Sequence, residues 1–179
     1  MNNFLAKSNP RETIQEHTDK LLDNFHLLKN LYKNIRVNWD VLECACLYHD
    51  LGKMNLKFQS KVDGGKKYTN EIAHNLLSLA FLDINELKKR FSKEEIILLA
   101  QAIAFHHERG DYSDDNYNEE VELLKNEIIG FKYEKVKITD VKKISAKYFS
   151  NNRIHRDEST FFEYVKIKGL LNRLDYSAS

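Results

Sequence analysis

An apolar run over residues 39–48 leads into the stretch Leu47-Tyr48-His49-Asp50-Leu51-Gly52-Lys53. Asn38 is a good helix N-cap, and the run behind it is apolar on nearly every side. This pattern predicts a central helix with other helices around it, and Gly52 is a natural stop signal just beyond its end. The His49-Asp50 pair, an imidazole beside a carboxylate, should therefore lie at the C-terminal end of a buried helix.

The composition favours a helical domain. The chain has 179 residues, enough to bury a sizeable core in one domain. A single proline and six glycines leave few helix breakers, which favours long helices over a strand-rich fold. The net charge of +1 gives no overall field for nucleic acid, so any polyanion site must be a local patch. We expect one all-α domain over residues 1–179.

Several classes of protein are excluded by the same inspection. Cys44 and Cys46 lie inside the apolar run, and a C-x-C pair is no zinc motif, so we interpret them as buried thiols in a reducing cytosol. Residues 1–10 contain no apolar signal-peptide region. No window approaches the roughly 20 apolar residues of a membrane span. We expect a cytoplasmic protein.

Two further helices carry histidines on their apolar faces. A first helix over residues 11–33 has apolar residues at helical spacing, and His17 lies among them. Residues 55–68 look like a basic connector. A third helix, capped by Thr69 or Asn70, follows it and places His74 on one face with Leu77.

The second half of the chain adds the remaining polar residues. A capping box at Ser92 opens a fourth helix that should end at Gly110, with the His106-His107 pair in its last turn. Residues 108–120 read as a mobile surface loop and residues 121–129 as a weaker helix.

The sequence predicts the structure of the last helix clearly but leaves that of residues 131–148 open. Residues 131–148 fit either a short strand pair or a helix. A capping box at Thr160 and Glu163 opens the last helix, which turns Asp175 toward its apolar face.

Several inward-facing imidazoles and carboxylates would leave a core full of unpaired polar groups, and metal ions satisfy them most economically. One buried histidine alone is more often an ordinary core residue, so the argument rests on the whole set. The candidate ligands are His17, His49, Asp50, His74, His106, His107 and Asp175. Seven ligands suit two ions that share one carboxylate, and Asp50, central in the set, is the natural bridge. Imidazole-rich sites favour Mn²⁺, Co²⁺, Ni²⁺ or Fe²⁺, with Zn²⁺ or Mg²⁺ as alternatives.

The ordered pattern of these residues resembles the HD phosphohydrolase superfamily, and within it the HD nuclease of type I CRISPR interference. The similarity spans His17 to Ser179 and is closest at three stretches. They are Tyr48-His49-Asp50-Leu51-Gly52-Lys53, Ala104-Phe105-His106-His107 and Leu174-Asp175-Tyr176-Ser177-Ala178-Ser179. The adjacent histidines and the Asp-x-x-Ala-Ser element are more particular to the CRISPR group than the general HD core.

The resemblance implies an HD helical bundle with a metal site between its central helices, and hydrolysis of single-stranded DNA by hydroxide attack at two metal ions. One ion would be held by His17, His49, Asp50 and Asp175, the second by Asp50, His74, His106 and His107. Catalysis would rest on Asp50 and on Lys53, which would face the scissile phosphate. A superfamily 2 helicase, in cis or in trans, and a Cascade-type surveillance complex would be its partners. The chain would be either a stand-alone subunit or a piece cut before the helicase.

Other readings of the same residues stay open. The same ligands would serve an HD phosphohydrolase that acts on nucleotides or cyclic dinucleotides, and a non-enzymatic helical module with structural histidines is a third reading. Lys57 and Lys61 after the site are candidates for DNA binding, or a solvated loop. His26 and His155 have no evident partner and stay outside the site. A second basic tract is either a solvated face or a docking surface and comprises Lys132, Lys135, Lys137, Lys142, Lys143 and Lys147.

Overall fold

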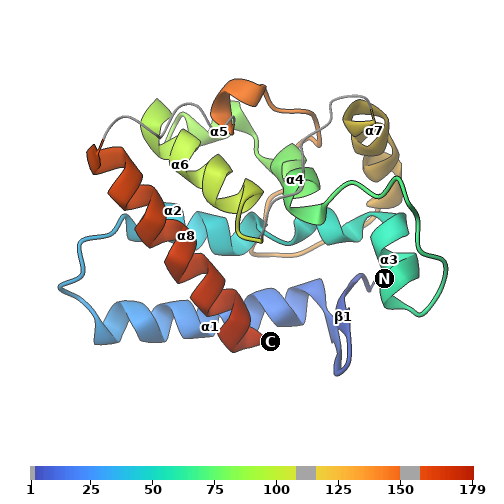
Figure 1. Cartoon of the computed structure of the whole chain (residues 1–179), viewed down its shortest axis with the longest axis horizontal. Coiled ribbons are helices and arrows are strands. Elements are labelled where there is room, and N and C mark those ends of the chain that lie inside the picture. Colours follow the sequence, from blue (N-terminus) through green and yellow to red (C-terminus); the bar gives the residue numbers. More distant parts are fainter. Residues whose placement is uncertain (1–2, 108–115, 150–157) are drawn as a thin grey trace.

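The computed structural model describes residues 3–107, 116–149 and 158–179, and these are mostly helical, which confirms the all-α prediction (Figure 1). The elements in chain order are β1 (Leu5–Ser8), β2 (Arg11–Thr13), α1 (Ile14–Leu31), α2 (Trp39–Tyr48), the 3₁₀ turn η1 (Leu51–Met54), α3 (Leu56–Val62), α4 (His74–Ser78), η2 (Leu79–Phe81), α5 (Ile84–Leu87), α6 (Lys93–Ala104), α7 (Tyr117–Glu127), η3 (Ala146–Tyr148) and α8 (Glu158–Ala178).

Helix α2 is the centre of the bundle, as its sequence predicts. It packs against α1, α6 and α8, and α8 crosses the other three helices (Figure 1). Asn38 caps its N-terminus by accepting a hydrogen bond from the Val41 N–H at 3.1 Å. Cys44 and Cys46 are free and buried in this helix, in agreement with the interpretation of two core thiols. No helix in the described ranges is long and apolar enough to cross a membrane.

The N-terminal region differs from the prediction. The first helix begins at Ile14 rather than residue 11, because a capping box between Thr13 and Glu16 fixes its start. The residues before it form an antiparallel hairpin, β1–β2, in which Lys7 pairs with Glu12. Strands of three or four residues carry too few side chains to show an alternating pattern, so they cannot be recognised from sequence alone.

The segment over residues 55–68, predicted as a basic connector, is in part helical. Its first half is helical, because Asn55 caps α3 by accepting from the Lys57 N–H at 3.0 Å. Its second half is irregular and contains Gly64 with φ of 80°. The predicted cap at Thr69 or Asn70 was wrong, since α4 begins at His74.

Two helix ends in the second half were misplaced. The predicted capping box at Ser92 is present, but α6 ends at Ala104, so His106 and His107 follow the helix instead of lying in it. Gly110, its predicted end, lies outside the described residues. Helix α7 begins at Tyr117, inside the loop predicted over residues 108–120.

The end of the chain brings two further corrections. Helix α8 begins at Glu158, ahead of the predicted cap at Thr160. Residues 131–148 form neither alternative, since an isolated bridge between Tyr133 and Val136 and the turn η3 are their only regular structure.

Candidate metal centre

The His49-Asp50 pair lies where α2 ends. His49 is the C-cap residue, and its Nδ1 lies 3.0 Å from the carbonyl oxygen of Cys46, one turn back. A carbonyl only accepts, so Nδ1 carries the proton and donates it, and Nε2 on the far side of the ring is left for another partner. Both side chains are buried. Burial by itself would lower the pKa of His49, but Asp50 and Asp175 raise it above its ordinary value.

A first cluster gathers around one oxygen of Asp50. Helix α1 contributes His17, whose Nε2 lies 2.9 Å from Asp175 Oδ1 and 3.6 Å from Asp50 Oδ2. The Nε2 of His49 lies 3.5 Å from the same Asp50 oxygen and 3.7 Å from Asp175 Oδ1. The four ligand atoms of His17, His49, Asp50 and Asp175 all lie within 4.8 Å of one another, as a metal site requires.

A second cluster forms on the other oxygen of Asp50. The Nε2 of His74 lies 3.4 Å from Asp50 Oδ1, and the Nε2 of His106 lies 4.0 Å from it. His107 completes the group, with its ring centre 4.1 Å from that of His106 and 5.0 Å from that of His74. The ligand atoms of these four residues again lie within 4.8 Å of one another. Asp50 therefore belongs to both clusters and turns one oxygen toward each.

The donor set fits divalent cations. Four buried atoms that face one another have no hydrogen-bond partner: His49 Nε2, Asp50 Oδ1, His74 Nε2 and His106 Nε2. Buried polar atoms without partners are costly. Asp50 Oδ1 and the Nε2 atoms of neutral His49 and His106 are lone-pair acceptors, and His74 Nε2 is one when its Nδ1 carries the proton, so a shared cation would satisfy all four together. Burial and the nearby charge of His49 hold the pKa of His106 well below its ordinary value, which keeps that ring available as a ligand.

The two carboxylates stay ionised in spite of their burial. Burial would raise the pKa of Asp50, yet the positive charges of Lys53 and His49 hold it well below the usual range. Burial acts in the same direction on Asp175, and the hydrogen bond with His17 together with the nearby His49 ring holds its pKa well below the usual range. Anionic oxygens among imidazoles strengthen the attraction for a cation at both clusters.

Hydrogen bonds from the far side of the ring fix the direction of two ligands, His49 and His106. His106 repeats the arrangement of His49, with Nδ1 2.7 Å from the carbonyl oxygen of Ile103, one turn back in α6. His17 differs, because its Nδ1 lies 3.4 Å from the buried carboxylate of Glu12 without making a hydrogen bond. Metal-binding histidines commonly donate their second ring N–H to a carbonyl or carboxylate, as His49 and His106 do here, which sets the tautomer and the ring orientation.

Gly52 allows the elements of the second cluster to meet. A Cβ at this position would lie 2.0 Å from the carbonyl oxygen of His74 and 2.6 Å from the backbone nitrogen of Ser78, so only glycine fits. Ser78 joins the two segments further, because its hydroxyl accepts from the Gly52 N–H at 2.8 Å and donates to the carbonyl of His49 at 2.7 Å. The predicted role of Gly52 as a helix stop was therefore incomplete, since its main task is close backbone packing.

The three predicted lysines differ in their positions. The Nζ of Lys53 lies 2.7 Å from Asp50 Oδ2, directly at the clusters. Lys57 and Lys61 lie on α3, where Lys57 pairs with Glu120, and Lys61 pairs with Glu71 at 2.5 Å. Both α3 lysines are thus already neutralised by carboxylates, which the sequence alone did not indicate.

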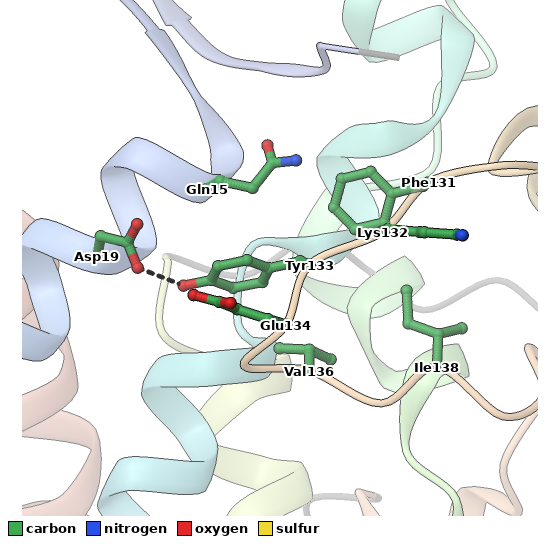
Figure 2. A pocket seen from close by; sticks show the side chains of 8 residues that line it. All are labelled: Gln15, Asp19, Phe131, Lys132, Tyr133, Glu134, Val136 and Ile138. Carbon is green, nitrogen blue, oxygen red and sulfur yellow. Dashed lines mark hydrogen bonds between the residues drawn. The ribbon is translucent and has the colours of Figure 1, made fainter. Parts of the chain in front are cut away.

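A hollow of about 630 Å³ lies between α1 and residues 131–138. Figure 2 shows Gln15 and Asp19 of α1 on one side of the hollow and Tyr133 on the other, with the Tyr133 hydroxyl donating to Asp19 Oδ1 at 2.8 Å. Gln15 and Asp19 lie two residues to either side of His17, so they project from a different side of the helix. None of the candidate ligands lines this hollow, and it is therefore separate from the two clusters.

The structure thus brings all seven predicted ligands together, in two groups that share Asp50, while ligation itself stays a prediction. His26 is exposed on α1, away from the clusters, as expected, and His155 lies outside the described residues. Reasoning from sequence missed two supporting residues. Glu12 lies in a strand too short to show an alternating pattern, and nothing in the sequence marks Ser78 as the residue that joins the Gly52 and His49 backbones.

The comparisons with known proteins agree with this geometry. The HD domain family profile matches residues 14–147, about three quarters of the chain. Searches of the curated proteins and of the solved structures found no match. The profile covers six of the candidate ligands, and only Asp175 lies beyond it and rests on geometry alone. The chain belongs to the HD domain family, and it is a metal-dependent phosphohydrolase.

Proposed function

We propose that this chain is a metal-dependent nuclease that hydrolyses single-stranded DNA, as the HD nuclease of type I CRISPR interference does. The observation that carries the proposal is the sharing of Asp50, whose two oxygens face two separate ligand clusters. Two ions held by one carboxylate suit a phosphodiester, because one can stabilise the attacking oxygen and the other the leaving oxygen.

The roles of the residues follow from their positions. We assign one ion to His17, His49, Asp50 and Asp175, and the other to Asp50, His74, His106 and His107. Divalent ions held there would supply an activated water and positive charge at the phosphate. Lys53 contacts Asp50 at 2.7 Å, so its ammonium group is close enough to neutralise charge that develops on a phosphate between the clusters.

Access to the second cluster favours a polymer over a small nucleotide. His74 is half-buried and His107 is exposed, so this cluster reaches the protein surface. A strand of DNA needs such an open approach, whereas a nucleotide enzyme encloses the base of its substrate. A strand that followed α3 would meet Lys57 and Lys61, and its phosphates would compete there with Glu120 and Glu71. A superfamily 2 helicase and a Cascade-type complex are the partners that would deliver single-stranded DNA to it.

The test is a cleavage assay with the chelator-treated protein. End-labelled single-stranded DNA, duplex DNA and single-stranded RNA are offered with Mn²⁺, Co²⁺, Ni²⁺, Fe²⁺, Zn²⁺ or Mg²⁺. We expect cleavage of single-stranded DNA that needs a divalent ion and is lost in Asp50→Asn, which keeps the size of the side chain. Asp63→Asn is the matched control, because Asp63 is exposed and pairs only with Arg11 among the described contacts. Cleavage by Asp50→Asn at the parental rate would refute the assignment of the site.

A parallel screen separates the competing activity. Nucleoside phosphates and cyclic dinucleotides are offered under the same conditions, with release of phosphate or linear product as the readout. Hydrolysis of these compounds with no cleavage of DNA would overturn the nuclease proposal and leave a metal-dependent phosphohydrolase of small molecules.

A further inference from the structure

The ring of His17 lies between carboxylates on both sides. Its Nε2 faces Asp175 and Asp50 in the first cluster, and its Nδ1 lies 3.4 Å from Glu12 Oε2. Glu12 comes from β2 and is only 3% exposed, but it belongs to neither of the two clusters. A buried carboxylate directly behind a candidate ligand needs an explanation.

Two lysines hold Glu12 in place. Lys7, its cross-strand partner in the hairpin, has its Nζ 2.8 Å from Oε2. Lys20, three residues after His17 on α1, has its Nζ 2.5 Å from Oε1. Each carboxylate oxygen therefore has its own cation, so the group remains an anion with a fixed position. The same Lys7 also donates to the carbonyl of Ser179 at 2.7 Å, which joins the hairpin to the end of the helix that carries Asp175.

His17 lacks the support that the helix ends provide elsewhere. His49 and His106 each follow a helix and donate from Nδ1 to a carbonyl of its last turn. His17 lies in the first turn of α1, where the helix offers N–H groups instead of free carbonyls. An acceptor for its Nδ1 must come from outside the helix. The buried Nδ1 has no hydrogen-bond partner, and the carboxylate that faces it is Glu12 of the hairpin, 3.4 Å away.

We propose that Glu12 is a positioning residue for the metal centre. Its carboxylate accepts the Nδ1–H of His17, and this turns Nε2 of the same ring toward the ion of the first cluster. This inference rests on metal binding by that cluster and not on the identity of the substrate. A carboxylate in this place fixes the tautomer and the orientation of the ring and makes the ligand more basic, and losing such a partner typically weakens metal binding by about 10- to 100-fold.

The test compares Glu12→Gln with Glu16→Gln in a His106→Ala background, so that the first cluster dominates the measured binding. Glu16 directly precedes His17, and its carboxylate accepts from Thr13 in the capping box of α1 instead of facing the His17 ring nitrogens. Chelator-treated proteins are titrated with Co²⁺, and the visible absorption bands report the ligand field. We expect Glu12→Gln to bind Co²⁺ about 10- to 100-fold more weakly with an altered spectrum, and Glu16→Gln to match the parent.

A second readout separates positioning from a purely structural salt bridge. In the Zn²⁺-loaded protein, the ¹⁵N shifts of the His17 ring show which nitrogen carries the proton. We expect a protonated Nδ1 in the parent, a changed shift in Glu12→Gln, and partial recovery in Glu12→Asp. Parental affinity, spectrum and shifts in Glu12→Gln would overturn the inference while leaving the proposed function intact. A parent that binds no ion at the first cluster would overturn both, whereas binding without DNA cleavage would count only against the nuclease.

Discussion

Replacing Gly52 with alanine should damage the protein more than any surface change of the same size. The new Cβ would lie 2.0 Å from the carbonyl oxygen of His74 and 2.6 Å from the nitrogen of Ser78, both of them backbone atoms. Contacts shorter than 3.0 Å are essentially never seen for Cβ atoms, so η1 and α4 must separate by about 1 Å.

The cost can be worked from these contacts. Overpacking of this kind costs about 1–3 kcal/mol. The two buried hydrogen bonds through the Ser78 hydroxyl span the same contact, and losing both would add about 2 kcal/mol. The expected loss is about 3–5 kcal/mol, against a total stability of about 5–15 kcal/mol for a domain. Displacement of His74 from Asp50, now 3.4 Å away, should also weaken the second ion by tenfold or more.

Urea unfolding of the metal-free protein, followed by circular dichroism, measures the loss of stability, and Mn²⁺ titration measures the loss of affinity. Gly169→Ala is the matched control. Gly169 lies in α8 with no heavy atom within 4 Å of an added Cβ, so this change should stabilise by about 0.5–1 kcal/mol. A Gly52→Ala protein within about 1 kcal/mol of the parent, with two ions bound as before, would refute the reasoning.

Three further outcomes are expected. The Lys53→Met protein should bind ions more tightly, because the ammonium that pairs with Asp50 is gone. It should also cleave DNA about 100-fold more slowly, because no cation neutralises the charge that develops on the phosphate. Parallel metal titration and cleavage assays measure the two effects. His106→Ala should lower the number of tightly bound ions from two to one by direct metal analysis, whereas two retained ions would contradict the division of ligands. Burial raises the pKa of Cys44 to about 12, so its thiol should react with a disulfide reagent at pH 8 about 10³-fold more slowly in the native than in the unfolded protein. Since the unfolded thiol ionises near pH 9, the stabilisation from keeping it neutral is present below that pH and is lost above it, and unfolding curves between pH 8 and 10 would show the decline.

The convergence of the seven candidate ligands could be predicted because they lie on or beside strongly apolar helices. His17 falls between Ile14 and Leu21 at helical spacing, and Asp175 follows Leu171 by four residues, so the same periodicity that builds the core also turns them inward. Ligands on such helices are placed by the packing of the bundle.

What could not be predicted depends on tertiary contacts. Helix α3 is rich in lysine and has only two large apolar residues in its first turn, Leu56 and Phe58, so its periodicity was weak. The end of α6 before His106 carries no glycine or proline, and the turn there is stabilised by the histidine ring itself. Glu12 became visible only when the hairpin placed it behind His17, because burial of a charged side chain is decided by its partners.

The bonds from the His49 and His106 rings to the carbonyls of Cys46 and Ile103 carry a consequence for folding. Each ring bonds a carbonyl in the last turn of a helix, where intrahelical donors run out, so the ligands are oriented before any ion arrives. A zinc finger, in contrast, folds only when its metal binds. This protein should therefore be folded without metal and take up its ions without a folding transition. Ion binding would then add to stability only by mass action, about 2.7 kcal/mol at a free ion concentration of 100 times the Kd.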